Sequence, residues 1–444
     1  MASQFSLFKR RHFSAMFFTQ FLGAFNDNIF KQALILILTY TAATKMGMKI
    51  SQLNNLAALL FILPYFLFSA LAGQIADKYE KSMLTQSIKL LEIIIMAIAA
   101  IGFWFELYWL LFLALFLMGA QSTFFGPVKY AYLPEVMHKN ELVGANGLFQ
   151  TGTSLAILIG MIVAGLLTQL NHANIWLIGV TLIVAILGYI SAKFLPYTPA
   201  RTTDLAINWN IFSTSFSLIK YLYSLPLLFF VIIGNSWFWF YGATFLTQMP
   251  ELSKMILHSD ESVVILLLIL FSVGVSLGSL LCKTLTKNQV SLKLLPFGMI
   301  GLSLFAIDLY FSLSAINISS GSIHDISSIF GVQGAWRVFA DLFCLGFFGG
   351  VYIVPMYAFM QAYAPISHRS RIVGTNNIFN AIFMVGSAIF SIIMLSQLGL
   401  SLPMLFFVSG ILNALFGICL YRKLMKYRHT MVMNDDNTST LRYL

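Results

Sequence analysis

The sequence predicts an all-α integral membrane protein whose twelve transmembrane helices form two pseudo-symmetric bundles of six. Three observations lead to this prediction. The chain is 59% hydrophobic and only 9% charged, with a mean hydropathy of +0.84, a composition typical of chains that face lipid. Twelve apolar stretches approach or exceed the roughly 20 residues that a spanning helix needs. An internal repeat relates the two halves of the chain.

The apolar stretches do not show the strict alternation of β-barrel strands. The first stretch is too long and too polar for a cleavable signal peptide. Their approximate limits are 14–41, 51–76, 83–103, 106–134, 140–170, 173–195, 222–250, 260–284, 290–316, 331–361, 370–398 and 401–422.

The repeat supports a division of the chain at its longest polar connection. "VGANGLFQ" at 143–150 begins the fifth span, and "VGTNNIFN" at 373–380 begins the eleventh, which is the equivalent position in the second half. Parallel halves of six helices are typical of transporters that alternate access around a midplane site. We therefore expect four parts: an N-terminal bundle over 1–195, a cytoplasmic linker over 196–221, a C-terminal bundle over 222–423 and a cytoplasmic tail over 424–444.

The distribution of basic residues predicts the orientation. With the N-terminus in the cytoplasm, eighteen Lys and Arg residues fall in cytoplasmic segments, and three, Lys45, Lys49 and Lys254, fall on the opposite side. Both termini are therefore expected in the cytoplasm. The net charge of +10 follows from this bias, so we expect no nucleic-acid partner.

No motif for catalysis or cofactor binding is found. The sequence has no Walker loop, no H-E-x-x-H and no G-x-S-x-G. Its three cysteines lack metal-site spacing, and we expect neither a metal nor another cofactor. A membrane-embedded lipid-modifying enzyme would need a His, Ser or Cys cluster near an interface, and the seven histidines are scattered. We therefore expect a protein that is not an enzyme.

One span carries charges where hydrocarbon is expected. In "FLGAFNDNIFKQAL", at 21–34, Asp27 and Lys31 lie at i and i+4, and Gln20 lies within about 40° of them on the same helical face. A passive neutral pair is one interpretation. Intramembrane charges usually face a cavity or pathway, however, and Asn26 and Asn28 widen the polar arc. All five are therefore candidate substrate-binding residues.

The loop "GQIADKYEK" at 73–81 joins the second and third spans and resembles the G-x-x-x-D-[RK]-x-x-[RK] loop of the major facilitator superfamily. Gly73 would let two helices approach closely. Asp77 can pair with Lys78 or Lys81, or cap a helix N-terminus. A solvated charged turn is the alternative.

Arg337 and Asp341 in the tenth span lie at i and i+4. We expect them to form a structural or gating pair rather than part of a substrate site.

Three segments of the first half resemble the bacterial lysophospholipid transporters, a branch of the major facilitator superfamily. They are "FLGAFNDNIFKQAL", "GQIADKYEKSMLTQSIKLLE" and "FFGPVKYAYLPE" followed by "VGANGLFQ". In the second half the resemblance depends on "VPMYAFMQ" and "VGTNN".

The resemblance implies a major facilitator fold in the bacterial inner membrane. It also implies transport of lysophosphatidylethanolamine and related lysolipids from the outer to the inner leaflet. A separate acyltransferase at the cytoplasmic face would then restore the second chain. No histidine is followed by an aspartate five places on, so the H-x-x-x-x-D acyltransferase motif is absent. The partners implied are a lysophospholipid, membrane lipids and that acyltransferase.

A lysophospholipid headgroup would suit the polar residues of the first span. Asp27 suits an ammonium, Lys31 a phosphate, and the amides suit hydroxyl or phosphate oxygens. Lys129, in "GPVKYAY", could simply snorkel to the interface, but the resemblance favours a headgroup contact.

The seventh span contains a run of aromatic residues, "GNSWFWFYGATF". Asn235, Trp237 and Trp239 would line an acyl-chain path or hold a quaternary ammonium. Ordinary packing is the alternative. A second function also stays open, since a proton-coupled exporter or importer of amphiphilic drugs or siderophores would use the same fold with Asp27 as the proton carrier.

Overall fold

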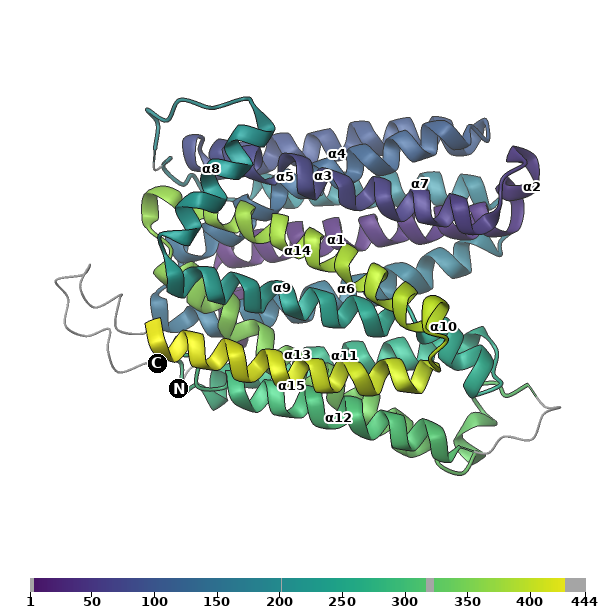
Figure 1. Ribbon diagram of the computed structural model, residues 1–444. Coiled ribbons are helices and arrows are strands. Elements are labelled where there is room, and N and C mark those ends of the chain that lie inside the picture. Colours follow the sequence, from purple (N-terminus) through teal and green to yellow (C-terminus); the bar gives the residue numbers. More distant parts are fainter. Residues whose placement is uncertain (1–3, 201, 317–322, 428–444) are drawn as a thin grey trace. The chain divides into compact units, whose positions relative to one another are not determined.

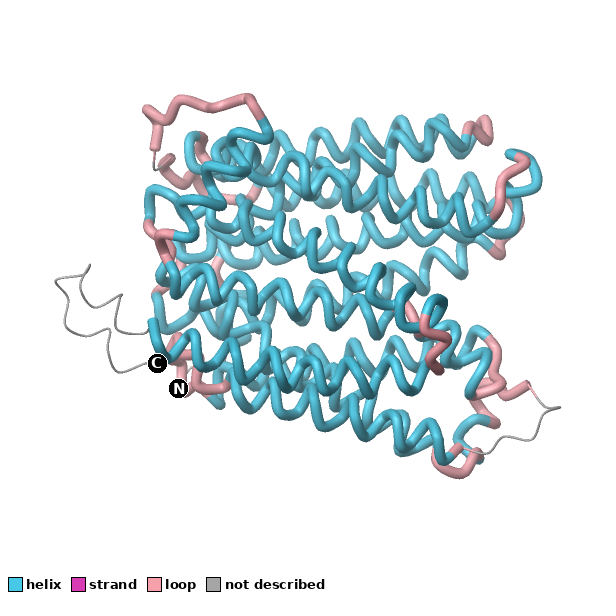
Figure 2. Tube along the Cα trace, in the orientation of Figure 1, coloured by secondary structure: helices cyan, strands magenta, loops and turns pink. Residues whose placement is uncertain are grey.

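The computed structural model describes residues 4–200, 202–316 and 323–427, and over these residues it consists of helices and loops (Figures 1 and 2). Twelve of the described helices are long and apolar enough to cross a membrane, which confirms the predicted fold class. They are α1 (Arg11–Ile37), α3 (Ile50–Lys78), α4 (Lys81–Trp104), α5 (Tyr108–Val136), α6 (Leu142–Thr168), α7 (Ala173–Lys193), α9 (Pro226–Leu246), α11 (Glu261–Leu285), α12 (Leu295–Ala315), α13 (Ala335–Tyr363), α14 (Arg369–Ile392) and α15 (Leu402–Tyr427).

Shorter helices lie between the spans. They include α2 (Ala43–Met46), α10 (Met249–Glu251) and α8 (Ile211–Tyr223). Helix α8 begins inside the predicted cytoplasmic linker, 196–221, and ends two residues beyond it. The expected tail over 424–444 begins inside α15, and its residues from 428 onward lie outside the described part of the chain.

Several helices begin at side chains that accept backbone hydrogen bonds. The Glu80 carboxylate accepts from the backbone N–H groups of Ser82 and Met83 at the start of α4. Asn210 and Asp260 do the same at the starts of α8 and α11. Such caps satisfy N–H groups that have no partner within the first helical turn, so the loop sequences fix where these helices begin.

The contacts divide the chain into two compact units, and each is described by itself. The first unit comprises Met1–His138, Leu155–Ser224 and Ala364–Ala381, and the second comprises Lys139–Ser154, Leu225–Tyr363 and Ile382–Leu444. Helices α6 and α14 therefore each contribute their N-terminal segment to one unit and the remainder to the other. These are the two helices that begin with the repeated octets.

The same packing pattern occurs inside both units. In the first unit α3 packs on α5, α4 packs on α5 and α7, and α1 packs on α5 and α7. In the second unit α11 packs on α13, α12 packs on α13 and α15, and α9 packs on α13 and α15. Each helix of the first set therefore has a counterpart six spans later with equivalent neighbours, as expected of a repeat.

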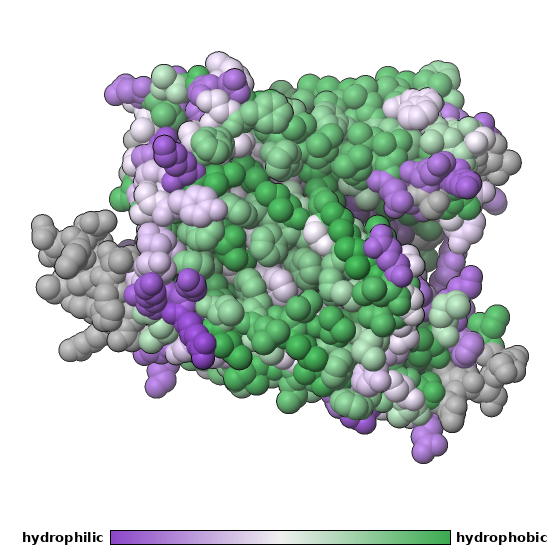
Figure 3. Space-filling model, viewed as in Figure 1, coloured by the Kyte–Doolittle hydropathy of each residue, from purple (hydrophilic) through white to green (hydrophobic). Residues whose placement is uncertain are grey.

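The flanks of the spanning helices expose large apolar side chains. Ile94 of α4, Ile183 of α7 and Leu304 of α12 are all more than half exposed. On the face drawn in Figure 3, hydrophobic residues cover the flanks of the helices and hydrophilic residues gather near helix ends. Such a surface is stable in lipid rather than in water.

Candidate functional site

Polar side chains of three helices lie near the middle of their spans in the first unit. Asp27 lies about four and a half helical turns after the start of α1, Ser122 about four turns after that of α5, and Glu92 about three turns after that of α4. A rise of 1.5 Å per residue places them about 24, 21 and 17 Å from those starts. These depths are close to the centre of a hydrocarbon core about 30 Å thick, where transporter sites commonly lie.

Asp27 accepts a hydrogen bond from a neighbouring helix. The Ser122 hydroxyl donates to Oδ2 of Asp27 at 2.6 Å, and the Tyr65 hydroxyl of α3 lies beside Ser122. The second carboxylate oxygen of Asp27, Oδ1, is buried and has no hydrogen-bond partner among the described residues. Since buried polar atoms in folded proteins nearly always have a partner, this oxygen is an unfilled acceptor at mid-membrane depth.

Lys31 does not form the ion pair with Asp27 that the i, i+4 spacing suggested. Its ammonium group lies over the Phe61 ring, 5.1 Å from the centroid, and no ion pair joins it to a carboxylate in the described part of the chain. The pairing expectation is therefore wrong. Asp27 uses one oxygen on α5, while Lys31 turns toward α3 and interacts with Asp27 only at longer range.

Lys129 is held in a similar way. Its ammonium group lies 4.8 Å from the Tyr130 ring centroid and 5.8 Å from that of Phe125, within electrostatic range of Asp27. We define the headgroup cluster as Asp27, Ser122, Lys31 and Lys129. It holds one carboxylate and two ammonium groups that rest on aromatic faces.

A second group of polar side chains, the buried quartet, lies beside the headgroup cluster and consists of Asn26, Lys89, Glu92 and Gln121. Lys89 donates to Oε2 of Glu92 at 2.6 Å, Gln121 donates to the same oxygen at 3.1 Å, and Asn26 donates to Oε1 at 3.0 Å. Both charged side chains are only 1% exposed. Because Lys89 and Glu92 neutralise each other and both Glu92 oxygens have donors, the quartet is a structural ion pair. The amide oxygen of Asn26 is buried and has no hydrogen-bond partner among the described residues.

The polar residues of α1 therefore point to different neighbours. Asn26 joins the buried quartet on α4 and α5. Asn28 donates to the Ala24 carbonyl at 2.7 Å and lies against Gly160 of α6, while Gln20 is buried. Of the residues predicted on this helix, the structure brings Asp27 and Lys31 into one cluster with Lys129 and separates Asn26 and Asn28 from them.

The predicted residues of α9 lie in the second unit and are used in packing. The indole N–H of Trp237 donates to Asn413 at 2.8 Å, and that of Trp239 to the Tyr357 hydroxyl at 3.2 Å. The Trp237 ring stacks on Phe416 with centroids 4.2 Å apart. Asn235 is fully buried. These contacts agree with ordinary packing of the aromatic residues. That Asn235, Trp237 and Trp239 line an acyl-chain path stays a prediction.

Asp77, in the last turn of α3, caps another helix. Its carboxylate accepts from the backbone N–H groups of Ser370 and Arg371 at 2.9 and 3.3 Å, and from Nε of Arg371 at 2.9 Å. A Cβ at Gly73 would lie 2.7 Å from the Arg371 Cα. The predicted close approach and the predicted cap are both present, and the partner is the N-terminus of α14.

The other predicted gating residues have partners that spacing did not indicate. Lys81 pairs with Glu135 of α5 at 2.8 Å, with both side chains 2% exposed or less, while Lys78 lies over the Tyr79 ring. Neither pairs with Asp77 among the described residues.

The expected pairing of Arg337 with Asp341 is wrong. Arg337 pairs with Asp308 of α12 instead, and Asp341 accepts from the Ser312 hydroxyl at 2.6 Å. The long Arg337 side chain, near the start of α13, reaches Asp308 on a neighbouring helix. The Asp341 carboxylate, which lies on the same helix as Arg337, is buried and bonds to Ser312 instead.

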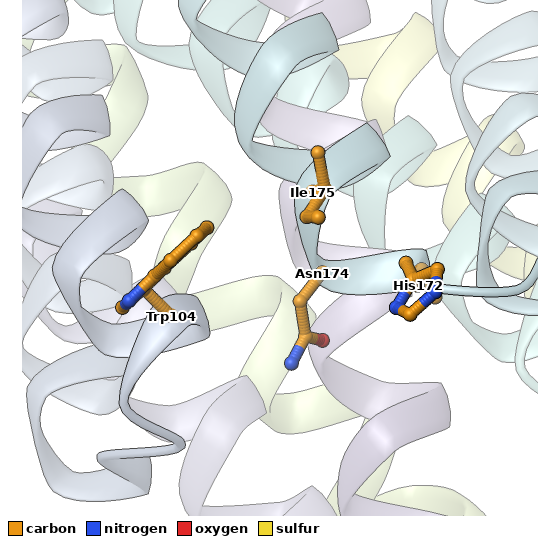
Figure 4. Close-up of a pocket in the computed structure, with 5 residues that line it drawn as sticks. Trp104, His172, Asn174 and Ile175 are labelled. Atoms are coloured by element: carbon orange, nitrogen blue, oxygen red, sulfur yellow. The ribbon is translucent and has the colours of Figure 1, made fainter.

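One surface pocket lies apart from these charges. Trp104 lies on one side of it, at the end of α4, and His172, Asn174 and Ile175 at the start of α7 lie on the other (Figure 4). It holds no carboxylate or ammonium group, so it does not have the chemistry of the headgroup cluster.

Sequence reasoning missed Ser122, Gln121, Glu135 and Arg371 as partners. The "QST" run at 121–123 in the middle of an apolar span was the available signal for the first two. No sequence pattern links Asp77 to Arg371, because the contact joins residues 294 positions apart.

A chain of twelve spanning helices with repeated packing and a charged mid-membrane cluster has the architecture of a membrane transporter. The chain belongs to the Major Facilitator Superfamily, whose family model matches residues 16–340.

Two of its curated relatives carry the same name. Lysophospholipid transporter LplT of Photorhabdus laumondii is 27% identical over 79% of this chain and 80% of its own length. Lysophospholipid transporter LplT of Cronobacter sakazakii is 26% identical over 94% of this chain and 97% of its own. The comparison thus confirms the resemblance found in the sequence.

A solved structure shares the fold. The human organic anion transporter MFSD10 (TETRAN) matches with a TM-score of 0.73 and 14% identity, over 93% of this chain and 99% of that one. At this identity the match describes the fold alone.

Proposed function

We propose that this protein is a lysophospholipid transporter that moves lysophosphatidylethanolamine and related lysolipids from the outer to the inner leaflet of the bacterial cytoplasmic membrane by alternating access. The name and extent of similarity of the relatives support this proposal. The observation that carries it is the headgroup cluster, whose unfilled carboxylate oxygen and two lysines without ion-pair partners among the described residues lie within the membrane.

The cluster suits a zwitterionic headgroup. Oδ1 of Asp27 would accept from the ammonium group of the lipid, and Lys31 and Lys129 would donate to its phosphate oxygens. Charge-assisted hydrogen bonds of this kind are about twice as strong as neutral ones. An ionisable residue inside a membrane costs a few kcal/mol on insertion scales, so three such residues with little mutual pairing fit a site that a charged ligand completes.

Both termini would lie in the cytoplasm, where a separate acyltransferase would consume the transported lipid. The excess of basic residues at one end of the spans supports this orientation. Labelling of Lys45→Cys and Lys78→Cys with a membrane-impermeant maleimide tests it. We expect Lys45→Cys to react from the periplasmic side and Lys78→Cys only after the membrane is opened. Reaction of both from the same side would contradict the topology.

Uptake by proteoliposomes tests the function. We expect fluorescent lysophosphatidylethanolamine to become inaccessible to extraction by external albumin faster in vesicles that contain the protein than in empty ones. Proton-coupled transport of amphiphilic drugs is the second candidate, because a mid-membrane carboxylate without an ion pair can also carry a proton. Drug uptake without lysolipid uptake would favour that candidate.

A further inference from the structure

Helix α8 exposes a row of aromatic side chains. Phe212, Phe216 and Tyr223 are 71%, 72% and 61% exposed, and Trp209, two residues before the helix, is 69% exposed. Spacings of four and seven residues place the three helical members on one face. Four large aromatic residues in a row would be an unfavourable surface to leave in water.

The opposite face of α8 is fixed on the end of α3. The Gln74 amide donates to the Thr214 hydroxyl at 3.2 Å, and its oxygen accepts from the backbone N–H of Asn208 at 3.0 Å. Leu218 packs in a small cluster with Ala70 of α3 and Ile378 of α14. The aromatic row therefore has a defined direction, away from α3.

These contacts also give the depth of α8 along the spanning helix. Gln74 and Ala70 lie four and eight residues before the end of α3 at Lys78, which is about 6 and 12 Å at 1.5 Å per residue. Helix α3 has 29 residues and is thus about 44 Å long, so about 7 Å of it projects beyond each side of a hydrocarbon core about 30 Å thick. Helix α8 thus lies at the level where headgroups meet acyl chains.

The composition of the exposed face matches that level. Trp and Tyr are enriched where membranes meet water, and interfacial helices combine large apolar residues with Lys. Lys220 is exposed beside the aromatic row, and residues 205–224 contain no acidic side chain. An anionic leaflet would attract such a surface.

We propose that α8 is seated in the interface of the leaflet at the basic end of the bundle, with Trp209, Phe212, Phe216 and Tyr223 among the headgroups and upper acyl chains. This inference depends on the proposed orientation only for which of the two leaflets is meant. It does not depend on which substrate is transported. Phe66 of α3 and Tyr79, directly after that helix, are exposed as well.

When α8 lies in the membrane interface, it also holds α3 and α14 together. We call this function of α8 the strap. Leu218 shares one buried cluster with Ala70 of α3 and Ile378 of α14, and the Tyr221 ring stacks on His368, just before α14 begins, with ring centroids 4.5 Å apart. Beneath it, Gly374 of α14 packs directly on the backbone carbonyl of Ser69. Opening this contact would require α8 to move against the leaflet that holds it.

Spin labels at Phe212→Cys and Phe216→Cys test whether α8 lies in the membrane interface. The protein used has no native cysteines and is reconstituted in vesicles of phosphatidylethanolamine and phosphatidylglycerol. Labels at Asp204→Cys, exposed in the linker, and at Ile94→Cys, exposed on α4, mark water and hydrocarbon. We expect the collision rates of both α8 labels, with oxygen and with a water-soluble nickel chelate, to lie between the rates of the two marker positions. Chelate access equal to that at Asp204 would overturn the proposal. Shielding from both reagents, which means cover by protein, would overturn it as well.

A triple variant tests the strap. Changing Trp209, Phe212 and Phe216 to Ser should let a maleimide label Ser69→Cys several times faster, because the seat no longer holds α8 on the α3–α14 contact. Ser279→Cys is the matched control. Its backbone carbonyl packs on Gly147 of α6 in the same manner, and both serines are fully buried. No change at Ser69, or an equal change at both sites, would contradict the strap.

Discussion

The carboxylate of Asp27 takes its hydrogen bond from Ser122 on α5, at 2.6 Å, and not from Lys31 one turn further along its own helix. This relationship changes what Asp27 can do. A carboxylate bound within its own helix to a lysine would be a neutral, passive pair. A carboxylate oriented by a hydroxyl from another helix keeps a second oxygen for a ligand.

Ser122→Ala should weaken transport without preventing insertion. Hydrogen bonds to charged groups contribute about 1.5–3 kcal/mol, so we expect the concentration for half-maximal lysolipid uptake to rise roughly tenfold, since about 1.4 kcal/mol corresponds to that factor. Thr123→Ala is the matched control, because its hydroxyl donates to the Gly119 carbonyl of its own helix at 2.7 Å and to no other residue in the described part of the chain. Equal losses in the two variants would point to general damage to α5 instead.

Lys31→Gln and Lys129→Gln should each reduce lysolipid uptake, on the order of tenfold, because each removes a charge-assisted donor to phosphate. Lys78→Gln is the control, because the Lys78 ammonium group also lies over a tyrosine ring, 5.9 Å from the Tyr79 centroid, but outside the cluster. This variant should transport normally. Since Asp27 and Lys31 form no ion pair, Lys31→Gln should not rescue Asp27→Asn. Recovery of transport in that double variant would reject the headgroup cluster and restore the passive pair.

Glu135→Gln should destabilise the protein, because it leaves Lys81 charged and buried. Breaking a buried ion pair by removing one partner costs about 3–5 kcal/mol, whereas replacing both partners by apolar residues is often neutral. The double variant Glu135→Leu with Lys81→Met should therefore melt close to the parent when unfolding is followed in detergent. Unchanged melting of the single variant would contradict the role assigned to this pair.

Collapse of the proton gradient should leave lysolipid uptake intact. A lipid that is consumed by acylation on the inner side needs no active pumping, so transport is expected to be a facilitated process. Uptake by proteoliposomes with and without a protonophore measures this. Complete loss of uptake would favour the proton-coupled alternative, with Asp27 as the carrier.

The sequence was sufficient for the spans because lipid imposes one strong requirement, a long run of apolar residues. Each predicted span corresponds to a described helix, with ends differing by a few residues. It was also sufficient to single out Asp27 and Lys31, because charges stand out against hydrocarbon, whereas Lys129 is favoured only by the family resemblance. The role of all three in substrate binding stays a prediction. The sequence could not supply their partners. Side-chain pairing within one helix follows from spacing, but Ser122, Glu135 and Arg371 come from other helices, and their approach depends on packing.

Helix α8 shows a different limit of sequence reasoning. Its aromatic row is visible in "WNIFSTSFSLIKYLY", yet the segment is too short to span a bilayer, so the sequence alone predicts little more than a linker there. Only the contacts of Gln74 with Thr214 and of Ala70 with Leu218 give it a depth and a direction. Amphipathic pattern alone does not tell whether a helix lies on a membrane or on protein.

Lysophosphatidylethanolamine uptake by Asp27→Asn, compared with Asp341→Asn, tests the central claim most directly. Both residues are intramembrane aspartates that accept a serine hydroxyl at 2.6 Å, but only Asp27 belongs to the headgroup cluster. We predict that Asp27→Asn inserts normally and loses at least about tenfold in uptake, as expected for one charge-assisted contact, while Asp341→Asn transports like the parent per inserted molecule. Parental uptake by Asp27→Asn, or an equal loss in both variants, would contradict the account.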